Sequence, residues 1–282
     1  MIYIFGGINL DVVAKINGKA HLYESNIANI SLRAGGVGRN IARAIGNYSK
    51  CEFLTCIPNN LYNSVVSDLE RNNVSLKYSK YLNDIASLNM YLDIIDSDGV
   101  VIGACDTKAL LKFDESDIKN VLSIIKDDDI VVIDANIPEL AEYIVNNSKG
   151  FKMMDGVSSV KLERIKHFVN KLDFIKVNNL EYNIVKDRLP KNYLITNGHG
   201  GKIVYKNQEL VFDHKELTPV NPTGCGDTFL GTFIGNMDKP LKEAITLSII
   251  AAAASSQIDE AVPTISEIDR INKKDLNIIW ME

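Results

Sequence analysis

The chain has 282 residues, of which 46% are hydrophobic and 24% charged, and its formal net charge is −5. This length and composition allow a large buried core. The acidic balance, without a lysine- or arginine-rich run, argues against a nucleic acid or an anionic membrane surface as partner. The four cysteines have no metal-ligand spacing, and the sequence offers neither a basic leader nor a membrane-length apolar stretch. We therefore expect a cytoplasmic protein.

Short apolar runs alternate with segments of helical periodicity over most of the chain. The helical segments begin near Ile41, Leu61, Ile118, Leu140 and Leu162. Buried strands that alternate with amphipathic helices are typical of βαβ units, in which helices cover both faces of a mostly parallel sheet. The sequence therefore predicts one three-layer α/β/α domain over residues 1–282. The apolar runs that predict its strands are Ile2–Phe5, Phe53–Ile57, Ile130–Ile133, Lys152–Met154, Phe174–Val177 and Tyr193–Ile195.

Two segments interrupt this alternation and predict extended structure. From Leu88, apolar and polar residues alternate up to Asp96, and Asp96–Gly99 supplies a turn before another apolar run. Val12–Leu32 has no helical period. We expect a small accessory sheet from parts of residues 12–33 and 88–104, which is either a plain surface hairpin or a lid over a ligand site. Its apolar face needs cover from the main domain or from a second subunit, so a homodimer is expected.

Two polar motifs near the N-terminus are candidates for binding a polyhydroxyl ligand. Asn9 and Asp11 follow the first apolar run, and ligands bind such sheets in the loops beyond the carboxyl ends of the strands. Gly35 and Gly36 lie before a helical segment and permit close backbone approach, while Asn40 offers both a donor and an acceptor. On local grounds alone, each motif could equally be a turn.

The segment Asn221–Asp227 is the strongest candidate for a catalytic site. Gly224, Cys225 and Gly226 can turn tightly and direct consecutive N–H groups at one point, at the positive end of a following helix. Such a loop can hold a phosphate or a developing oxyanion. Asp227 beside it could orient a hydroxyl group and accept its proton. The alternative is an aspartate that merely caps a helix, and the Gly-x-Gly-Asp pattern alone leaves the two about even.

These motifs, taken in order with the hairpin, resemble the ribokinase-like carbohydrate kinase family, also called the PfkB family. The likeness in order and spacing extends over nearly the whole chain. It implies the ribokinase-like fold with a small β lid, and an enzyme that transfers the γ-phosphate of ATP to a primary hydroxyl group. Asp227 is then the base, and Gly224, Cys225 and Gly226 hold the transferred group. Asn9, Asp11, Gly35, Gly36 and Asn40 bind the acceptor substrate.

Two further motifs acquire a role only through this resemblance. Thr196–Gly201 is similar to the Thr-x-Gly-x-x-Gly turn of the family, which implies that Thr196, Gly198 and Gly201 contact the nucleotide. Asn178–Glu181 is similar to the Asn-x-x-Glu motif, which implies that Asn178 lies near the phosphates and that Glu181 helps to place Mg²⁺ through water. Pro222 departs from the family pattern in a stretch that often helps to bind K⁺, so a requirement for K⁺ stays open.

The acceptor substrate is a narrower question within the family. Gly35–Ala42 and Asp155–Ser158 are similar to the versions in pseudouridine kinases, which favours pseudouridine as acceptor and pseudouridine 5′-phosphate as product. A sugar kinase of the ribokinase or fructokinase type remains an alternative. Another is a catalytically silent protein of the same fold that binds a sugar or nucleoside, although the retained Asp227 favours an enzyme.

Overall fold

Ten strands form the central sheet in the part of the chain that the computed structural model describes, which is residues 1–59, 65–83, 89–215 and 217–281. The strands that lie in space from β6 (Val74–Ser75) at one edge to β13 (Asn192–Thr196) run parallel to one another. The strands β14 (Gly200–Tyr205), β15 (Gln208–Asp213) and β16 (Ile279–Met281), towards the other edge, are antiparallel to their neighbours. The mostly parallel sheet expected from the sequence is confirmed. Across the sheet the strands are β6 (Val74–Ser75), β4 (Cys51–Leu54), β1 (Ile2–Phe5), β10 (Ile130–Asp134), β11 (Phe151–Asp155), β12 (Phe174–Asn178), β13 (Asn192–Thr196), β14 (Gly200–Tyr205), β15 (Gln208–Asp213) and β16 (Ile279–Met281).

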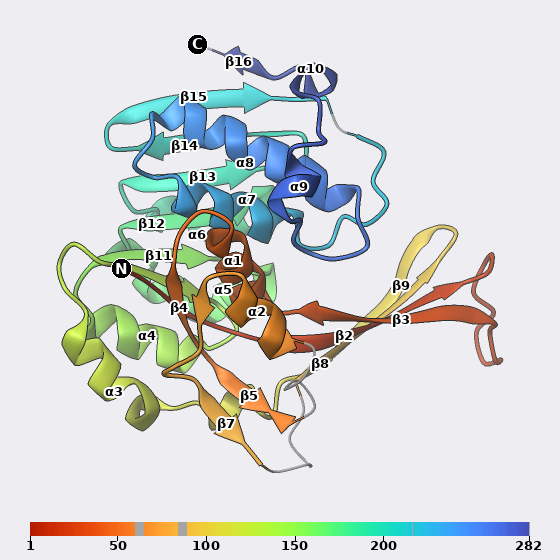
Figure 1. Ribbon diagram of the computed structural model, residues 1–282, viewed down its shortest axis with the longest axis horizontal. Helices are drawn as coiled ribbons and strands as arrows, with labels where there is room; N and C mark the ends of the chain where they lie inside the picture. The colour runs from red at the N-terminus through yellow and green to blue at the C-terminus, as the bar shows by residue number, and fades with distance from the viewer. Residues whose placement is uncertain (60–64, 84–88, 216, 282) are drawn as a thin grey trace.

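Helices cover both faces of this sheet and complete the three layers (Figure 1). Alternate residues of β1 divide between the two cores: Ile2 and Ile4 belong to one, and Tyr3 and Phe5 to the other, as the two-residue period of a strand requires. No helix in the described ranges combines the length and apolar character needed to cross a bilayer. The first core is covered by α1 (Val37–Gly46), α2 (Ser67–Arg71), α7 (Cys225–Gly235), α8 (Leu241–Ser256), α9 (Ile265–Ile268) and α10 (Lys273–Leu276), and the second by α3 (Glu115–Ile124), α4 (Pro138–Asn147), α5 (Ser159–Ile165) and α6 (Asn179–Val185), with the 3₁₀ turns η3 (Leu110–Lys112), η4 (Lys166–Lys171) and η5 (Lys186–Arg188).

The expected strands differ from the observed ones in several places, and β6 and β16 at the two edges of the central sheet were not expected. The apolar run Phe53–Ile57 divides between two sheets, because β4 ends at Leu54 and β5 (Cys56–Pro58) pairs with β7 (Lys80–Leu82). The hairpin of β14 and β15 was not predicted; it turns at Lys206 and Asn207, which both have positive φ angles. The helical segment expected near Leu61 begins outside the described residues, and its later part forms α2.

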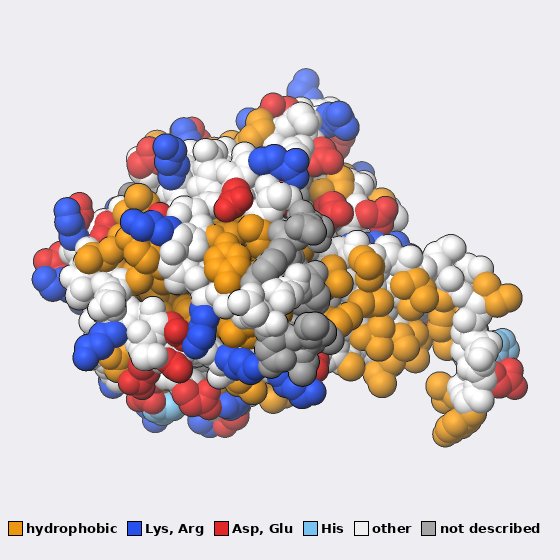
Figure 2. Space-filling model, turned by 60° about the horizontal axis from the view of Figure 1, so that its bottom comes forward, with side chains coloured by type: hydrophobic (Ala, Val, Ile, Leu, Met, Phe, Trp, Pro, Cys, Tyr) orange, Lys and Arg blue, Asp and Glu red, His pale blue; other side chains and the backbone are white. Residues whose placement is uncertain are grey.

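A second, four-stranded sheet projects from the main body (Figure 1). Its strands, in spatial order, are β3 (Ala28–Gly35), β2 (Asn9–Ile16), β8 (Met90–Asp96) and β9 (Gly99–Asp106). The extended segments expected in Val12–Leu32 and the hairpin around Asp96–Gly99 are thus present, while Leu88 lies outside the described residues. Hydrophobic side chains gather over this projecting sheet (Figure 2). The exposed ones include Ile30, Leu32, Leu92, Val100, Val101 and Ile102.

Helices α1 and α7 pack closely because Gly231 on α7 has no side chain. A Cβ atom at Gly231 would lie 2.6 Å from the Cβ of Ala44 and 2.6 Å from the carbonyl oxygen of Ile41, both on α1. At Gly235, one turn later, a Cβ atom would lie 3.1 Å from the Cβ of Tyr48. The two glycines thus let the helix axes approach without a cofactor or ligand between them.

We expect the substitution Gly231→Ala to lower the free energy of unfolding by about 1–3 kcal/mol, because the added methyl group meets backbone that cannot yield easily. This loss outweighs the gain of about 1 kcal/mol in helix propensity. Gly235→Ala is the matched control and should destabilise less, since its new contact is with a side chain. Thermal denaturation of both variants checks the order. Equal or greater stability of Gly231→Ala than of wild type would contradict the close packing.

Candidate active site

Charged side chains stand at the carboxyl ends of three neighbouring strands of the central sheet. Asp134 on β10, Asp155 on β11 and Lys176 on β12 are cross-strand neighbours in register, and all three are buried. The ammonium group of Lys176 donates to Oδ2 of Asp155 at 2.8 Å. The carboxyl ends of parallel strands are where such sheets bind ligands. This row of charges therefore forms the floor of a candidate site.

The loop Asn221–Gly226 covers this floor and leads into α7. Gly224 has a φ angle of +85°, and a Cβ atom there would lie 2.6 Å from the carbonyl oxygen of Ala261. A Cβ atom at Gly226 would lie 2.8 Å from Nζ of Lys176. No side chain caps the start of α7, and the first N–H groups of a helix have no partner within it. The start of α7, where the helix dipole is positive, therefore lies beside the ammonium group of Lys176, and the two positive charges together favour an anion there.

Asp227 lies in the first turn of α7, directly above this loop. Its Oδ2 accepts a hydrogen bond of 2.9 Å from Nδ2 of Asn40 on α1. Burial, together with the negative charge of Asp155, raises the pKa of Asp227 to about 7, although Lys176 and Asn40 oppose the rise. A carboxyl group with such a pKa can change its protonation state near neutral pH.

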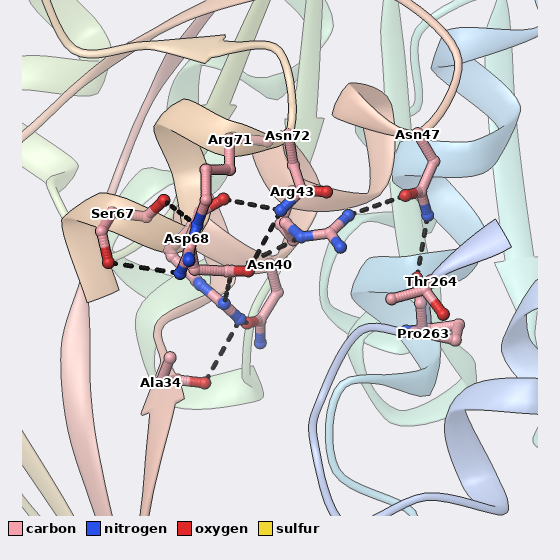
Figure 3. A network of polar contacts seen from close by, with 12 residues as sticks. Ala34, Asn40, Arg43, Asn47, Ser67, Asp68, Arg71, Asn72, Pro263 and Thr264 are labelled. Atoms are coloured by element: carbon pink, nitrogen blue, oxygen red, sulfur yellow. Dashed lines mark hydrogen bonds and ion pairs between the residues drawn. The ribbon is translucent and has the colours of Figure 1, made fainter. Parts of the chain in front are cut away.

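The orientation of Asn40 is fixed by a buried network between α1 and α2. Nη1 of Arg39 donates to Oδ1 of Asn40 at 3.1 Å, and Nη2 of Arg39 donates to Oδ2 of Asp68 at 2.6 Å. Figure 3 shows that Arg43 also reaches Asp68, at 3.4 Å, and donates to Asn47 at 2.7 Å. Because the amide oxygen of Asn40 faces Arg39, its amide nitrogen faces Asp227.

The polar motifs near the N-terminus meet where the four-stranded sheet joins the main body. Asn9 donates to Oδ1 of Asp11 at 2.7 Å, and a Cβ atom at Gly35 would overlap the carboxylate of Asp11. Gly36 has a φ angle of +98°, and a Cβ atom there would lie 2.5 Å from the carbonyl oxygen of Gly7. Burial raises the pKa of Asp11 to about 6, against the hydrogen bond from Asn9. Gly36 immediately precedes α1, so this cluster is tied to the helix that carries Asn40.

Residues of the Asn221–Gly226 loop line two cavities. One, of about 330 Å³, has Pro222, Cys225 and Gly226 on its wall, and the other, a narrow space of about 10 Å³, has Asn221 and Thr223. The larger cavity has apolar walls from α7, α8 and β15 and polar groups from the ends of β12 and β13. Its other lining residues are Lys176, Asn178, Thr196, Gly198, Gly200, Phe212, His214, Lys215, Leu217, Pro219, Phe229, Ala252, Ala253 and Ser256.

Only some of the residues that the sequence assigned to nucleotide binding line the larger cavity. Asn178, Thr196 and Gly198 line the larger cavity, whereas Gly201 and Glu181 do not. Gly201 lies in β14, where a Cβ atom would come within 2.9 Å of the ring of Phe212. Glu181 is buried and accepts a hydrogen bond of 2.9 Å from the backbone N–H of Asn178, as part of a capping box at the start of α6. In the described ranges, no group of three or more His, Cys, Asp or Glu side chains is arranged to hold a metal ion.

Sequence reasoning missed the charges on the floor of the site. Asp134, Asp155 and Lys176 received no catalytic role from the sequence, yet each stands in or at the end of an apolar strand. A charged residue in a run that is otherwise buried is the signal that could have found them, because a buried charge needs a partner.

Comparisons with known proteins agree on one family and one fold. A family model described as pfkB family carbohydrate kinase matches residues 1–265. Pseudouridine kinase of Escherichia coli (strain K12) is 26% identical in an alignment of 196 residues, which covers 64% of this chain but only 59% of that protein. Ribokinase of Thermotoga maritima shares the fold with a TM-score of 0.75 at 22% identity, over 95% of this chain and 97% of that one. A nucleoside kinase of Burkholderia thailandensis, solved with inosine, has a TM-score of 0.75 at 18% identity, over 95% and 96%.

We expect the carboxyl carbon of Asp227 to titrate with a midpoint at about pH 7 in ¹³C NMR of the ligand-free protein. The substitution Asn40→Ala should raise this midpoint, because it removes a hydrogen bond that favours the ionised form. Asn47→Ala is the matched control, since Asn47 bonds Arg43 and Pro263 and not Asp227. A midpoint near pH 4, or one that Asn40→Ala leaves unchanged, would contradict the buried, hydrogen-bonded environment.

Proposed function

Because the chain belongs to the pfkB family of carbohydrate kinases, we propose that it transfers the γ-phosphate of ATP to a primary hydroxyl group of a nucleoside or sugar. One observation carries this proposal. The loop that leads into Asp227 lines two cavities, one with Pro222, Cys225 and Gly226 and the other with Asn221 and Thr223. We therefore place a nucleotide in the first cavity and a hydroxyl acceptor towards the second, with the carboxylate of Asp227 between them. This arrangement brings the reacting groups together and excludes water from them.

In the proposed reaction, Asp227 orients the acceptor hydroxyl and takes its proton as the oxygen attacks the γ-phosphorus. A new oxygen–phosphorus bond forms, and the bond from the γ-phosphorus to the bridging oxygen breaks, so that ADP leaves with the electron pair. Backbone N–H groups of Gly224, Cys225 and Gly226 stabilise the charge on the transferred group. Lys176, next to Gly226, adds a positive charge on the same side.

The larger cavity suits ATP in shape and chemistry. Phe212, Leu217 and Phe229 give it apolar walls for a purine ring, while Lys176 and Asn178 give it polar groups at the end towards the loop. Mg²⁺, when bound, neutralises the phosphate oxygens. The described residues supply no cluster of ligands for it, so we propose that the phosphates and water hold the ion, with Asn178 and Glu181 nearby. A role for K⁺ beside Pro222 stays an open part of the proposal.

For the acceptor, we propose pseudouridine. The support is the likeness of Gly35–Ala42 and Asp155–Ser158 to pseudouridine kinases and the relative of that activity at 26% identity. Asn9, Asp11, Gly35, Gly36 and Asn40 would bind the ribose hydroxyls, since Asn40 contacts Asp227, Asn9 contacts Asp11, and Asp11 lines the narrow cavity with Asn221 and Thr223. A ribokinase- or fructokinase-type sugar kinase would use the same groups on a sugar without a base.

The four-stranded sheet is proposed to act as a lid. The cavity between its inner face and the glycine loop has a volume of only about 10 Å³, which is too small for a nucleoside. A substrate therefore enters only when the sheet moves outward. Gly35, the last residue of β3, and Gly36, which precedes α1, provide a hinge at this point.

A release assay for ADP, run over a panel of nucleosides and sugars, tests the function. With the best acceptor, we expect Asp227→Asn to lower kcat roughly 10²–10⁴-fold, because it keeps the shape and removes the base. Asp11→Ala should first raise KM, because its hydrogen bonds to the substrate already exist in the ground state. Asp238→Asn, an exposed aspartate just beyond the other end of α7, is the matched control. Wild-type turnover by Asp227→Asn would refute the assignment of the base, and no ADP release with any hydroxyl acceptor would refute the kinase.

We also propose that the lid forms a homodimer through its outer face, where Ile30, Leu32 and Leu92 are exposed and point the same way as Ile102. An exposed apolar face of this kind is unfavourable in water. Light scattering at micromolar concentration should give the mass of a dimer, and Leu32→Glu should give a monomer. Val160→Glu, an equally exposed apolar residue on α5, is the control and should stay dimeric. A wild-type monomer at this concentration contradicts the proposal.

A further inference from the structure

A second carboxylate lies on the inner face of the lid, farther from the hinge than Asp11. Asp93 on β8 is opposite Val13 on β2, whereas Asp11 is opposite Tyr91. The two aspartates thus point to the same face of the sheet, displaced by two residues, or about 7 Å, along neighbouring strands. Both line the narrow cavity beside the loop residues Asn221 and Thr223.

Asp93 is an acceptor that the protein itself does not use. Its side chain is 6% exposed, and its Oδ1 has no hydrogen-bond partner among the residues that the structure describes. Arg33, which lines the same cavity, donates instead to Asp259 at 3.0 Å. Burial raises the pKa of Asp93, and the charge of Arg33 opposes the rise. A buried carboxylate oxygen without a donor is unfavourable for folding, so a donor from a ligand would compensate it.

The surroundings of Asp93 suit a flat ring with a polar edge. Gly103 on β9 is opposite Asp93 and has no side chain. The hydroxyl group of Tyr91 packs over Gly103, 2.6 Å from where a Cβ atom of residue 103 would be. Tyr91 also lines the cavity. A ligand whose sugar hydroxyls reach Asp11 would therefore extend its base past Tyr91 towards Asp93.

We propose that Asp93 accepts a hydrogen bond from a ring N–H of the substrate's base and so selects pseudouridine over uridine. This inference rests on the proposed function. Pseudouridine is joined to its ribose through C5, which leaves N1–H as a free donor. When the two bases are superposed on their glycosidic bonds, uridine has C5–H at that position. An acceptor placed there gains a hydrogen bond from pseudouridine and stays unpaired against uridine, while a simple sugar does not reach it.

The test measures kcat/KM for pseudouridine, uridine and D-ribose in wild type and in Asp93→Ala. We expect the substitution to lower kcat/KM for pseudouridine about 10- to 100-fold and to change the other two values less than about threefold. Asp93→Asn, which retains a neutral acceptor, should give a smaller loss. Asp98→Asn, in the exposed turn of the same hairpin, is the matched control and should keep the wild-type preference.

A second readout separates recognition from a structural role. If Asp93 serves the substrate, the melting temperature of ligand-free Asp93→Asn should equal or exceed that of wild type, because an unpaired buried charge is removed. A lower melting temperature together with an equal loss on all three acceptors would overturn the inference, as would an unchanged preference. Failure of the proposed substrate is distinct: wild type would then phosphorylate D-ribose or uridine but not pseudouridine, which also refutes this base contact.

Discussion

The buried carboxylate of Asp134 organises the site, because three backbone N–H groups from separate segments converge on it. Its Oδ2 accepts from Gly7 at 2.7 Å and from Gly38 at 2.8 Å, and its Oδ1 accepts from Asn136 at 2.8 Å. Gly36, the N-cap of α1, has no side chain to cap the helix, so β10 supplies the cap from outside. The loop after β1 and the start of α1 are thereby held to the central sheet, and with them the proposed hinge at Gly36.

Helix α1 connects this anchored segment to Asp227, the proposed base. Asn40 lies on the first turns of α1, and the close contact of α1 with α7 at Gly231 brings its amide within 2.9 Å of Asp227. Arg39 and Asp68 fix which end of that amide faces the carboxylate. Besides burial, Asp155 raises the pKa of Asp227 while Lys176 lowers it, so the buried Lys176–Asp155 pair adjusts the basicity of this carboxyl group. Each of these interactions is between neighbouring side chains, and together they set the basicity of the Asp227 carboxyl group.

The sequence predicted those parts of the molecule that depend on local pattern. The apolar runs from Ile2–Phe5 to Tyr193–Ile195 lie in strands, and the glycine motifs lie where the backbone has positive φ or close contacts. Contacts between residues that are distant in the chain could not be predicted from local pattern. Lys176 and Asp155 were not assigned because their hydrogen bond joins two neighbouring strands that are distant in the chain. Asp93 was not assigned because its relevance depends on the absence of a hydrogen-bond partner for Oδ1 among the described residues. Glu181 shows the converse: its motif was recognised, but its described contact is a helix cap.

The proposed acceptor side of the site concentrates carboxylates whose charge the protein compensates only in part. Burial raises the pKa values of Asp11, Asp93 and Asp227, which means that their ionised forms are less favourable there than in water. Hydroxyl and N–H groups are the donors that such carboxylates lack, and a nucleoside carries both kinds. In the proposed function, donors from the substrate would offset this unfavourable free energy, most strongly when the proposed lid excludes water. A ligand without those donors would leave Oδ1 of Asp93 unpaired, so the proposed specificity for a polar, multi-donor acceptor depends on this folded arrangement.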